Sequence, residues 1–104
     1  MLDKAAVREI AVRYADEVKN ILDPVAVILF GSYVNGNPHE ESDIDIAIVV
    51  RDFQGNWLET ASMLCGLSWN ISLDIEPHLL DVNCDKSGFV EHVIKTGEVI
   101  YGAA

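Results

Sequence analysis

The residues of this chain with the clearest chemical potential are Asp43 and Asp45, which are separated by a single isoleucine. Successive side chains of a β-strand point to opposite faces, so the two carboxylates share one face, with Cβ atoms about 7 Å apart. At that spacing they can reach a common cation, and without a cation their repulsion raises a pKa or pushes them apart. Because Mg²⁺ binds carboxylates, waters and phosphate oxygens, the pair can supply the protein's share of a magnesium site.

A phosphate-binding turn and a further carboxylate are expected near this pair. Gly31 and Ser32 directly follow an apolar segment, and a turn of small residues lets backbone amides and a hydroxyl approach phosphate oxygens. Asp74 lies on a later predicted strand, with Glu76 on the same face. If the two strands are neighbours, Asp74 completes a carboxylate triad, and Glu76 is the alternative third member. Such a triad facing a phosphate-binding turn predicts a two-metal site for phosphoryl transfer.

The aspartate pair also has a simpler interpretation, because alternating acidic and apolar residues are typical of any half-exposed strand. A calcium-binding EF-hand loop starting at Asp43 is excluded, since the positions that require Gly and Glu hold Ile48 and Gln54. Phosphatases with an aspartate nucleophile carry a similar motif after an apolar strand, whereas here the apolar residues follow the motif. The chain contains no GxxxxGK[ST], GxGxxG or HExxH motif. The neighbouring Gly-Ser turn and third carboxylate therefore favour the metal site.

Alternating helices and strands are expected to position these residues. Apolar residues at helical spacing predict an amphipathic helix over residues 3–22, with Asp3 as its N-cap. The run VAVILF, residues 25–30, is typical of a strand covered on both faces, and Gly36 to Pro38 predict a loop. The other expected elements are a strand at 43–50, a helix at 57–69, a strand at 71–80, a helix at 87–96 capped by Ser87, and a short extended segment after Gly97.

The faces of the predicted strands follow from their alternation. In the strand at 43–50 the isoleucines point to one face, and Asp43, Asp45, Ala47 and Val49 point to the other. Pro77 limits the pairing of the third strand and predicts that part of it lies at a sheet edge. The sequence thus predicts one α/β (α+β) domain over residues 1–104, with a mixed three- to four-stranded sheet flanked by helices.

The composition narrows the class of function. Seven Lys and Arg against seventeen Asp and Glu give a net charge of −10, which argues against direct binding of a nucleic-acid backbone and suits metal cations or a basic partner surface. No apolar run approaches a membrane span or a signal peptide, so a cytoplasmic protein is expected. Cys65 and Cys84 are expected to be reduced thiols. The histidines at 39, 78 and 92 have no companions at metal-ligand spacing, so solvated or partly buried roles are expected for them.

Taken together, an apolar strand, Gly31-Ser32, ten further residues and then Asp43-Ile-Asp45 resemble the signature of the nucleotidyltransferase superfamily. The resemblance continues through Asp74 and the closing VIKTGEVIYG, so it covers nearly the whole chain. The length and spacing are most similar to the minimal nucleotidyltransferases, which are single-domain relatives of kanamycin nucleotidyltransferase and DNA polymerase β. The resemblance implies a minimal nucleotidyltransferase domain over residues 1–104.

The resemblance also implies a role for each site residue. Gly31 and Ser32 would hold the β- and γ-phosphates of a nucleoside triphosphate, with ATP as the expected substrate. Asp43 and Asp45 would bind two Mg²⁺ ions, with Mn²⁺ as the alternative metal. Asp74 would bind the second ion and help to deprotonate the acceptor hydroxyl, and Glu76 remains the alternative at this position.

Members of the resembled family commonly form toxin–antitoxin pairs with a HEPN-domain protein, and some transfer AMP onto that partner. The resemblance therefore implies an antitoxin that adenylylates a HEPN-domain protein. One alternative is a binding module that neutralises the HEPN toxin by contact, with weak or absent catalysis. Another is transfer to a small molecule such as an aminoglycoside. Self-association into a homo-oligomer is also compatible with a domain of this size.

Overall fold

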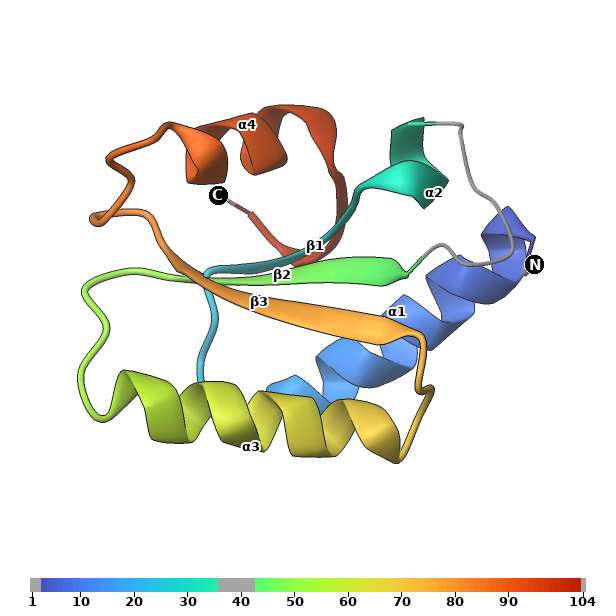
Figure 1. The fold of residues 1–104 in the computed structure, drawn as a ribbon, viewed down its shortest axis with the longest axis horizontal. Helices are drawn as coiled ribbons and strands as arrows, with labels where there is room; N and C mark the ends of the chain where they lie inside the picture. Colours follow the sequence, from blue (N-terminus) through green and yellow to red (C-terminus); the bar gives the residue numbers. More distant parts are fainter. Residues whose placement is uncertain (1–2, 36–42, 104) are drawn as a thin grey trace.

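The computed structural model describes residues 3–35 and 43–103, and within these ranges the chain forms four helices and four strands arranged in layers (Figure 1). The strands form one sheet in which the first pairs antiparallel with the second and fourth, and the second pairs parallel with the third. The predicted α+β fold with a mixed sheet flanked by helices is therefore confirmed. In chain order the elements are α1 (Lys4–Val18), β1 (Ala26–Phe30), α2 (Ser32–Asn35), β2 (Ile44–Val50), α3 (Trp57–Trp69), β3 (Ile75–Asp81), α4 (Phe89–Thr96) and β4 (Glu98–Gly102).

The sheet has the order β3-β2-β1-β4 and is covered by helices on both faces (Figure 1). On the side of α1 and α3, Ile44, Ile46 and Ile48 of β2 belong to the larger cluster of buried side chains. On the side of α4, Ala47 and Val49 belong to a second cluster. The predicted division of the β2 side chains between two faces is thus confirmed. Asp43 and Asp45 share the α4 side of the sheet, because strand side chains alternate.

The first helix packs through one apolar stripe, as predicted from its periodicity. Asp3 caps it, since the Asp3 carboxylate accepts a hydrogen bond of 2.8 Å from the main-chain N–H of Ala6. The Tyr14 hydroxyl donates a 2.7 Å hydrogen bond to the main-chain oxygen of Leu64 and so joins α1 to α3. Burial, and then the nearby Cys65, raises the pKa of Tyr14 well above its usual range. The buried stripe comprises Val7, Ala11, Tyr14, Ala15 and Val18.

The third strand lies at an edge of the sheet, as Pro77 predicted. The main-chain N–H of Ile44 donates to the oxygen of Asp74, and the N–H of Val82 donates to the oxygen of Val50. In a parallel ladder, alternate residues direct both main-chain groups to the same neighbour. The even-numbered residues of β3 therefore face β2, and Pro77 faces the free edge. Its missing N–H costs no hydrogen bond between strands there.

The observed elements differ from the predicted ones at their connections. Residues 32–35 form the short helix α2 where the sequence predicted only a turn. Strand β3 begins at Ile75 rather than at residue 71, because residues 72–74 belong to the turn that follows α3. The predicted loop around Gly36 to Pro38 and the histidine at position 39 lie outside the described residues.

The start of α4 also differs from its prediction. The helix begins at Phe89, and Asp85 supplies its main capping contacts by accepting hydrogen bonds from the N–H groups of Val90 (2.9 Å) and Glu91 (3.0 Å). Ser87 has a weaker part, since its hydroxyl oxygen accepts from the N–H of Phe89 at 3.3 Å. No helix in the described ranges has the length and apolar character needed to cross a membrane.

Candidate functional site

The antiparallel pairing of β1 and β2 places Gly31 beside Asp45. Phe30, the last residue of β1, lies opposite Asp45 in the ladder, and Gly31 follows with φ +83°. A side chain at Gly31 would overlap with Oδ2 of Asp45, as a Cβ built there shows. The left-handed backbone favours glycine at this position, and a Cβ there would force the Asp45 carboxylate to move. Ser32, half-buried, begins α2 directly after this contact.

The parallel pairing of β2 and β3 adds a second strand to the site. Asp45 lies opposite Glu76, and Ala47 lies opposite His78. One ligand atom from each of Asp45, Glu76 and His78 lies within 4.8 Å of the other two. Oδ1 of Asp45 and Nε2 of His78 are 3.3 Å apart. These three side chains, together with Asp43, are called the carboxylate–histidine cluster below.

Asp43 joins this cluster through Glu76. Glu76 is exposed overall, but the neighbouring groups exclude part of its water, and this desolvation is the largest cause that raises the pKa of its carboxyl. A side-chain hydrogen bond with Asp43 and the charges of Asp45 and Asp43 raise the pKa further, while His78 opposes the shift. The carboxylates therefore crowd negative charge into a small volume, which a bound cation would relieve.

The structure separates the two candidates for the third carboxylate. Asp74 is exposed and precedes β3, where its N–H donates to the Ser72 hydroxyl at 3.2 Å and its oxygen accepts from Ile44. Glu76, two residues further along the same face, is the carboxylate that shares a cluster with Asp45. The geometry therefore supports Glu76 as the third carboxylate, and Asp74 as a ligand stays a prediction.

His78 is a member of the cluster that the sequence did not predict. Its spacing along the chain shows no ligand pattern, because its companions come from another strand. The available signal was the strand alternation, which places His78 two residues after Glu76 and on the same face. The ring of Phe30 meets the His78 ring edge-on, with centroids 5.1 Å apart, and Phe89 of α4 packs against Phe30 at 5.8 Å. Aromatic packing thus holds one side of the imidazole.

The donor set fits a divalent cation. Carboxylate oxygens are the ligands that Mg²⁺ and Mn²⁺ prefer, and an imidazole nitrogen is accepted by first-row transition metals. Gly31 keeps the main chain close to the Asp45 carboxylate. Asp43 just before β2, Asp45 on β2 and Glu76 on β3 are the residues that could hold the ion or ions.

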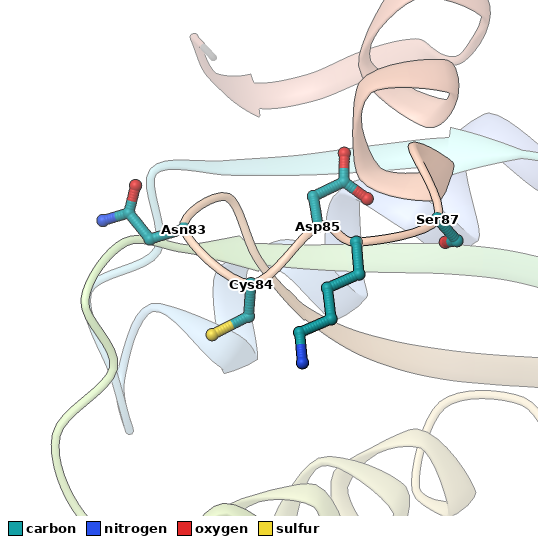
Figure 2. Close-up of a pocket in the computed structure, with 5 residues that line it drawn as sticks. Asn83, Cys84, Asp85 and Ser87 are labelled. Carbon is teal, nitrogen blue, oxygen red and sulfur yellow. The ribbon is translucent and has the colours of Figure 1, made fainter.

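A surface cavity of about 760 Å³ lies away from this cluster, in the loop that links β3 to α4 (Figure 2). The loop follows the carboxyl end of β3, whereas Asp45 and Glu76 lie near the amino ends of their strands. Asp85 in this loop already caps α4. We therefore place the candidate site at the carboxylate–histidine cluster and not in the loop cavity. The cavity is lined by Asn83, Cys84, Asp85, Lys86 and Ser87.

The wider family of the chain follows from its match to a known sequence family. Residues 13–104 match the family described as polymerase beta, nucleotidyltransferase. The chain belongs to this nucleotidyltransferase family. The resemblance inferred from Gly31-Ser32 and Asp43-Ile-Asp45 is thereby confirmed at the level of the family.

A curated relative is the protein adenylyltransferase MntA of Shewanella oneidensis (strain MR-1). The two proteins are 33% identical over 79 residues, which make up 73% of this chain and 52% of MntA. The chain therefore spans about half the length of this relative.

Three solved structures illustrate the similarity in fold. A protein assigned as a nucleotidyltransferase from Sulfolobus solfataricus superimposes with a TM-score of 0.68 at 21% identity, covering 95% of this chain and 83% of that chain. A toxin–antitoxin structure with AMP-PNP superimposes with a TM-score of 0.64 at 26% identity, covering 88% and 73%. A complex of a tri-AMPylated Shewanella oneidensis HEPN toxin with its MNT antitoxin gives a TM-score of 0.60 at 22% identity, covering 92% and 73%.

Proposed function

We propose that this chain is a metal-dependent nucleotidyltransferase that transfers AMP from ATP to a hydroxyl group on a HEPN-domain partner, and so acts as an antitoxin. The observation that carries the proposal is the convergence of Asp43, Asp45 and Glu76 beside Gly31 in a chain of the nucleotidyltransferase family. Two relatives support the choice of acceptor. MntA is a protein adenylyltransferase, and a structurally similar MNT antitoxin forms a complex with a tri-AMPylated HEPN toxin.

Each residue has a distinct part in the proposed site. Gly31 and the Ser32 hydroxyl bind the terminal phosphates of ATP, as the backbone approach at Gly31 allows. Asp43 and Asp45 hold the metal ions, which are two Mg²⁺ or Mn²⁺ ions in this proposal. When bound, such ions would supply neutralisation of the charge on the entering and leaving oxygens. Glu76 is favoured over Asp74 as the third carboxylate, because it shares a cluster with Asp45.

The reaction requires little chemistry from the protein beyond positioning. The acceptor hydroxyl oxygen forms a bond to the α-phosphorus of ATP, and the bond from that phosphorus to the bridging oxygen breaks. Pyrophosphate leaves with the electron pair, and the hydroxyl proton passes to the third carboxylate or through it to water. The carboxylates on β2 and β3 fix where the triphosphate and acceptor meet.

Label transfer tests the proposal directly. The chain is incubated with ATP labelled at the α-phosphate, Mg²⁺ or Mn²⁺, and a HEPN-domain protein as acceptor. We expect label on the partner, and loss of at least about a hundredfold in the rate for the double variant Asp43→Asn plus Asp45→Asn. Label that persists in the double variant contradicts the assigned site.

Neutralisation of the partner by contact alone is the second candidate function. Helix α3 favours it, because Trp57, Leu58 and Trp69 are 41%, 76% and 68% exposed and Glu59 is the one charged residue among its thirteen. Large exposed apolar side chains mark interaction surfaces more often than ordinary surface. If the double aspartate variant still neutralises the partner without transferring label, binding accounts for the antitoxin action and catalysis is dispensable.

A further inference from the structure

We infer that His78 is a direct nitrogen ligand in the metal site, so that the ion held by Asp45, Glu76 and His78 is a first-row transition ion such as Mn²⁺ in preference to Mg²⁺. The inference rests on the proposed function, because it concerns the same metal site. It assigns a role to a residue outside the carboxylates that the family signature supplies.

The distances in the cluster fit a shared ion. Two ligand atoms each about 2.1 Å from one ion lie about 3.0 Å apart in octahedral geometry and about 3.4 Å apart in tetrahedral geometry. Oδ1 of Asp45 and Nε2 of His78 are 3.3 Å apart, and Glu76 brings an oxygen within 4.8 Å of both atoms. A small closure of the Glu76 side chain would complete a common coordination sphere.

The fold directs the imidazole toward Asp45. His78 lies opposite Ala47 on the α4 side of the sheet. The small Ala47 methyl group leaves room beside the imidazole ring on that face. The ring can therefore lean along the sheet toward the position of Asp45, while Phe30 packs edge-on against it at 5.1 Å. Phe30 is itself the ladder partner of Asp45. One aromatic side chain thus supports both the strand pair and the histidine ring.

The chemistry of the donor set then selects the ion. Mg²⁺ is a hard cation that takes oxygen ligands and keeps several waters. An imidazole nitrogen adds affinity for first-row transition ions, which follow the Irving–Williams order. A different role is possible for the same contact: a protonated His78 would pair with Asp45 and compete with any cation. The two roles predict opposite effects when the histidine is removed.

Manganese binding to the nucleotide-free chain distinguishes these roles. Free Mn²⁺ is counted by electron paramagnetic resonance for the wild type, for His78→Gln and for the control His92→Gln, which changes an exposed histidine on α4. Mg²⁺ affinity is measured by competition with Mn²⁺. We expect His78→Gln to weaken Mn²⁺ binding at least about tenfold, to change Mg²⁺ binding less than about twofold, and the control to change neither. Equal weakening of both ions, or tighter binding in His78→Gln, overturns the inference.

A spectroscopic measurement on the wild type does not depend on the folding of any variant. Electron spin-echo modulation of bound Mn²⁺ should show the nitrogen of a coordinated imidazole, and its absence overturns the inference. The failure of the proposed function has another signature. If the wild type transfers label and binds Mn²⁺ without a nitrogen signal, only the role of His78 is wrong. If the wild type binds no divalent ion, the inference and the proposed function are both wrong.

Discussion

Carboxylates lie at both ends of the paired strands β2 and β3, but their surroundings differ. At the amino ends, Asp43 and Asp45 lie against Glu76, and desolvation and mutual repulsion raise the pKa of the Glu76 carboxyl. The pairing of the strands brings these groups together although their negative charges repel one another. Clustered carboxylates that destabilise the cation-free protein are typical of a functional site, and here they favour a site that binds a cation.

At the carboxyl ends of the same strands, Asp81 has the opposite environment. Its carboxylate accepts hydrogen bonds from the N–H groups of Phe53 (2.9 Å), Asn83 (2.9 Å) and Asp52 (3.3 Å). The bond from Phe53, followed by that from Asn83, lowers the pKa of Asp81. This carboxylate fastens the segment after β2 to the end of β3. The two ends of this strand pair therefore differ: the carboxylates of the proposed metal site lie at the amino ends, and a carboxylate that stabilises the fold lies at the carboxyl ends.

The largest expected effect comes from filling the space at Gly31. Gly31→Ala places a Cβ against Asp45 and keeps a residue with φ +83°, so we expect metal binding to be lost and label transfer to fall about a hundredfold. The backbone strain alone is worth about 1–2 kcal/mol. Melting curves with and without Mn²⁺, together with label transfer, measure the two effects separately.

Gly88→Ala is the matched control for this change. Gly88 also has positive φ, at +78°, but a Cβ built there has open space around it. The Gly88→Ala variant should have similar backbone strain but retain metal binding and label transfer. Equal loss of function in both variants would show that strain, and not contact with Asp45, explains the effect of Gly31→Ala.

The sequence predicted the parts of this site that depend on one strand at a time. The shared face of Asp43 and Asp45 follows from alternation, and the bounds of α3 follow from periodicity. The choice between Asp74 and Glu76 depends on the register of β3 against β2, which is a tertiary property that a single strand does not encode. His78 was missed for the same reason, because its companions are neighbours across strands.

The fold was predictable to a similar extent. The coverage of β1 on both faces follows from the continuous apolar run VAVILF, because burial on either side demands apolar residues. The short helix α2 was not predicted, since four residues carry too little periodicity to distinguish a helix from a turn. The sequence predicts Ser87 as the cap of α4, whereas Asp85 reaches the helix from further back in the loop.

After Gly31→Ala, the next largest effect is expected from removing the Asp81 carboxylate, and it should be on stability. Asp81→Ala leaves the N–H groups of Phe53 and Asn83 without this acceptor, so we expect the melting temperature to fall by several degrees. Asp23→Ala, at an exposed position, is the control and should change it little. Metal binding by folded Asp81→Ala should persist, because Asp45 lies near the other end of the strand pair. Loss of metal binding at unchanged stability would contradict the proposal that metal binding and stabilisation depend on carboxylates at opposite ends of β2 and β3.

Neutralisation of a binding carboxylate should have the opposite sign. Asp45→Asn removes one charge from the cluster, so we expect the metal-free protein to melt at the same temperature or a few degrees higher. Millimolar Mn²⁺ should raise the melting temperature of the wild type through binding to the folded state, but not that of Asp45→Asn. A metal-free Asp45→Asn that is as unstable as Asp81→Ala would indicate that Asp45 has a structural role.

The smallest expected effect is on the pH dependence of stability. The folded-state pKa of Glu76 is raised above its ordinary value of 4.5, so the folded protein binds its proton more readily than the unfolded chain. The free energy of unfolding should therefore rise as the pH falls through the raised pKa toward 4.5. For Asp81 the pKa is lowered from 3.8, so its contribution is present above 3.8 and is lost as the pH falls through the lowered value.

Urea unfolding of the metal-free protein at several pH values between 7 and 3 can separate these two contributions. Glu76→Gln should lose the gain in stability on mild acidification, while it keeps the loss at lower pH that depends on Asp81. The variant retains His78, Asp43 and Asp45, so its difference from the wild type isolates the Glu76 carboxyl. Glu9→Gln, an exposed change on α1, should follow the wild type throughout. If the pH dependence of Glu76→Gln also matches that of the wild type, the charges at the amino ends of β2 and β3 are too well solvated to interact. The two ends of the strand pair would then differ only in the hydrogen bonds that Asp81 accepts.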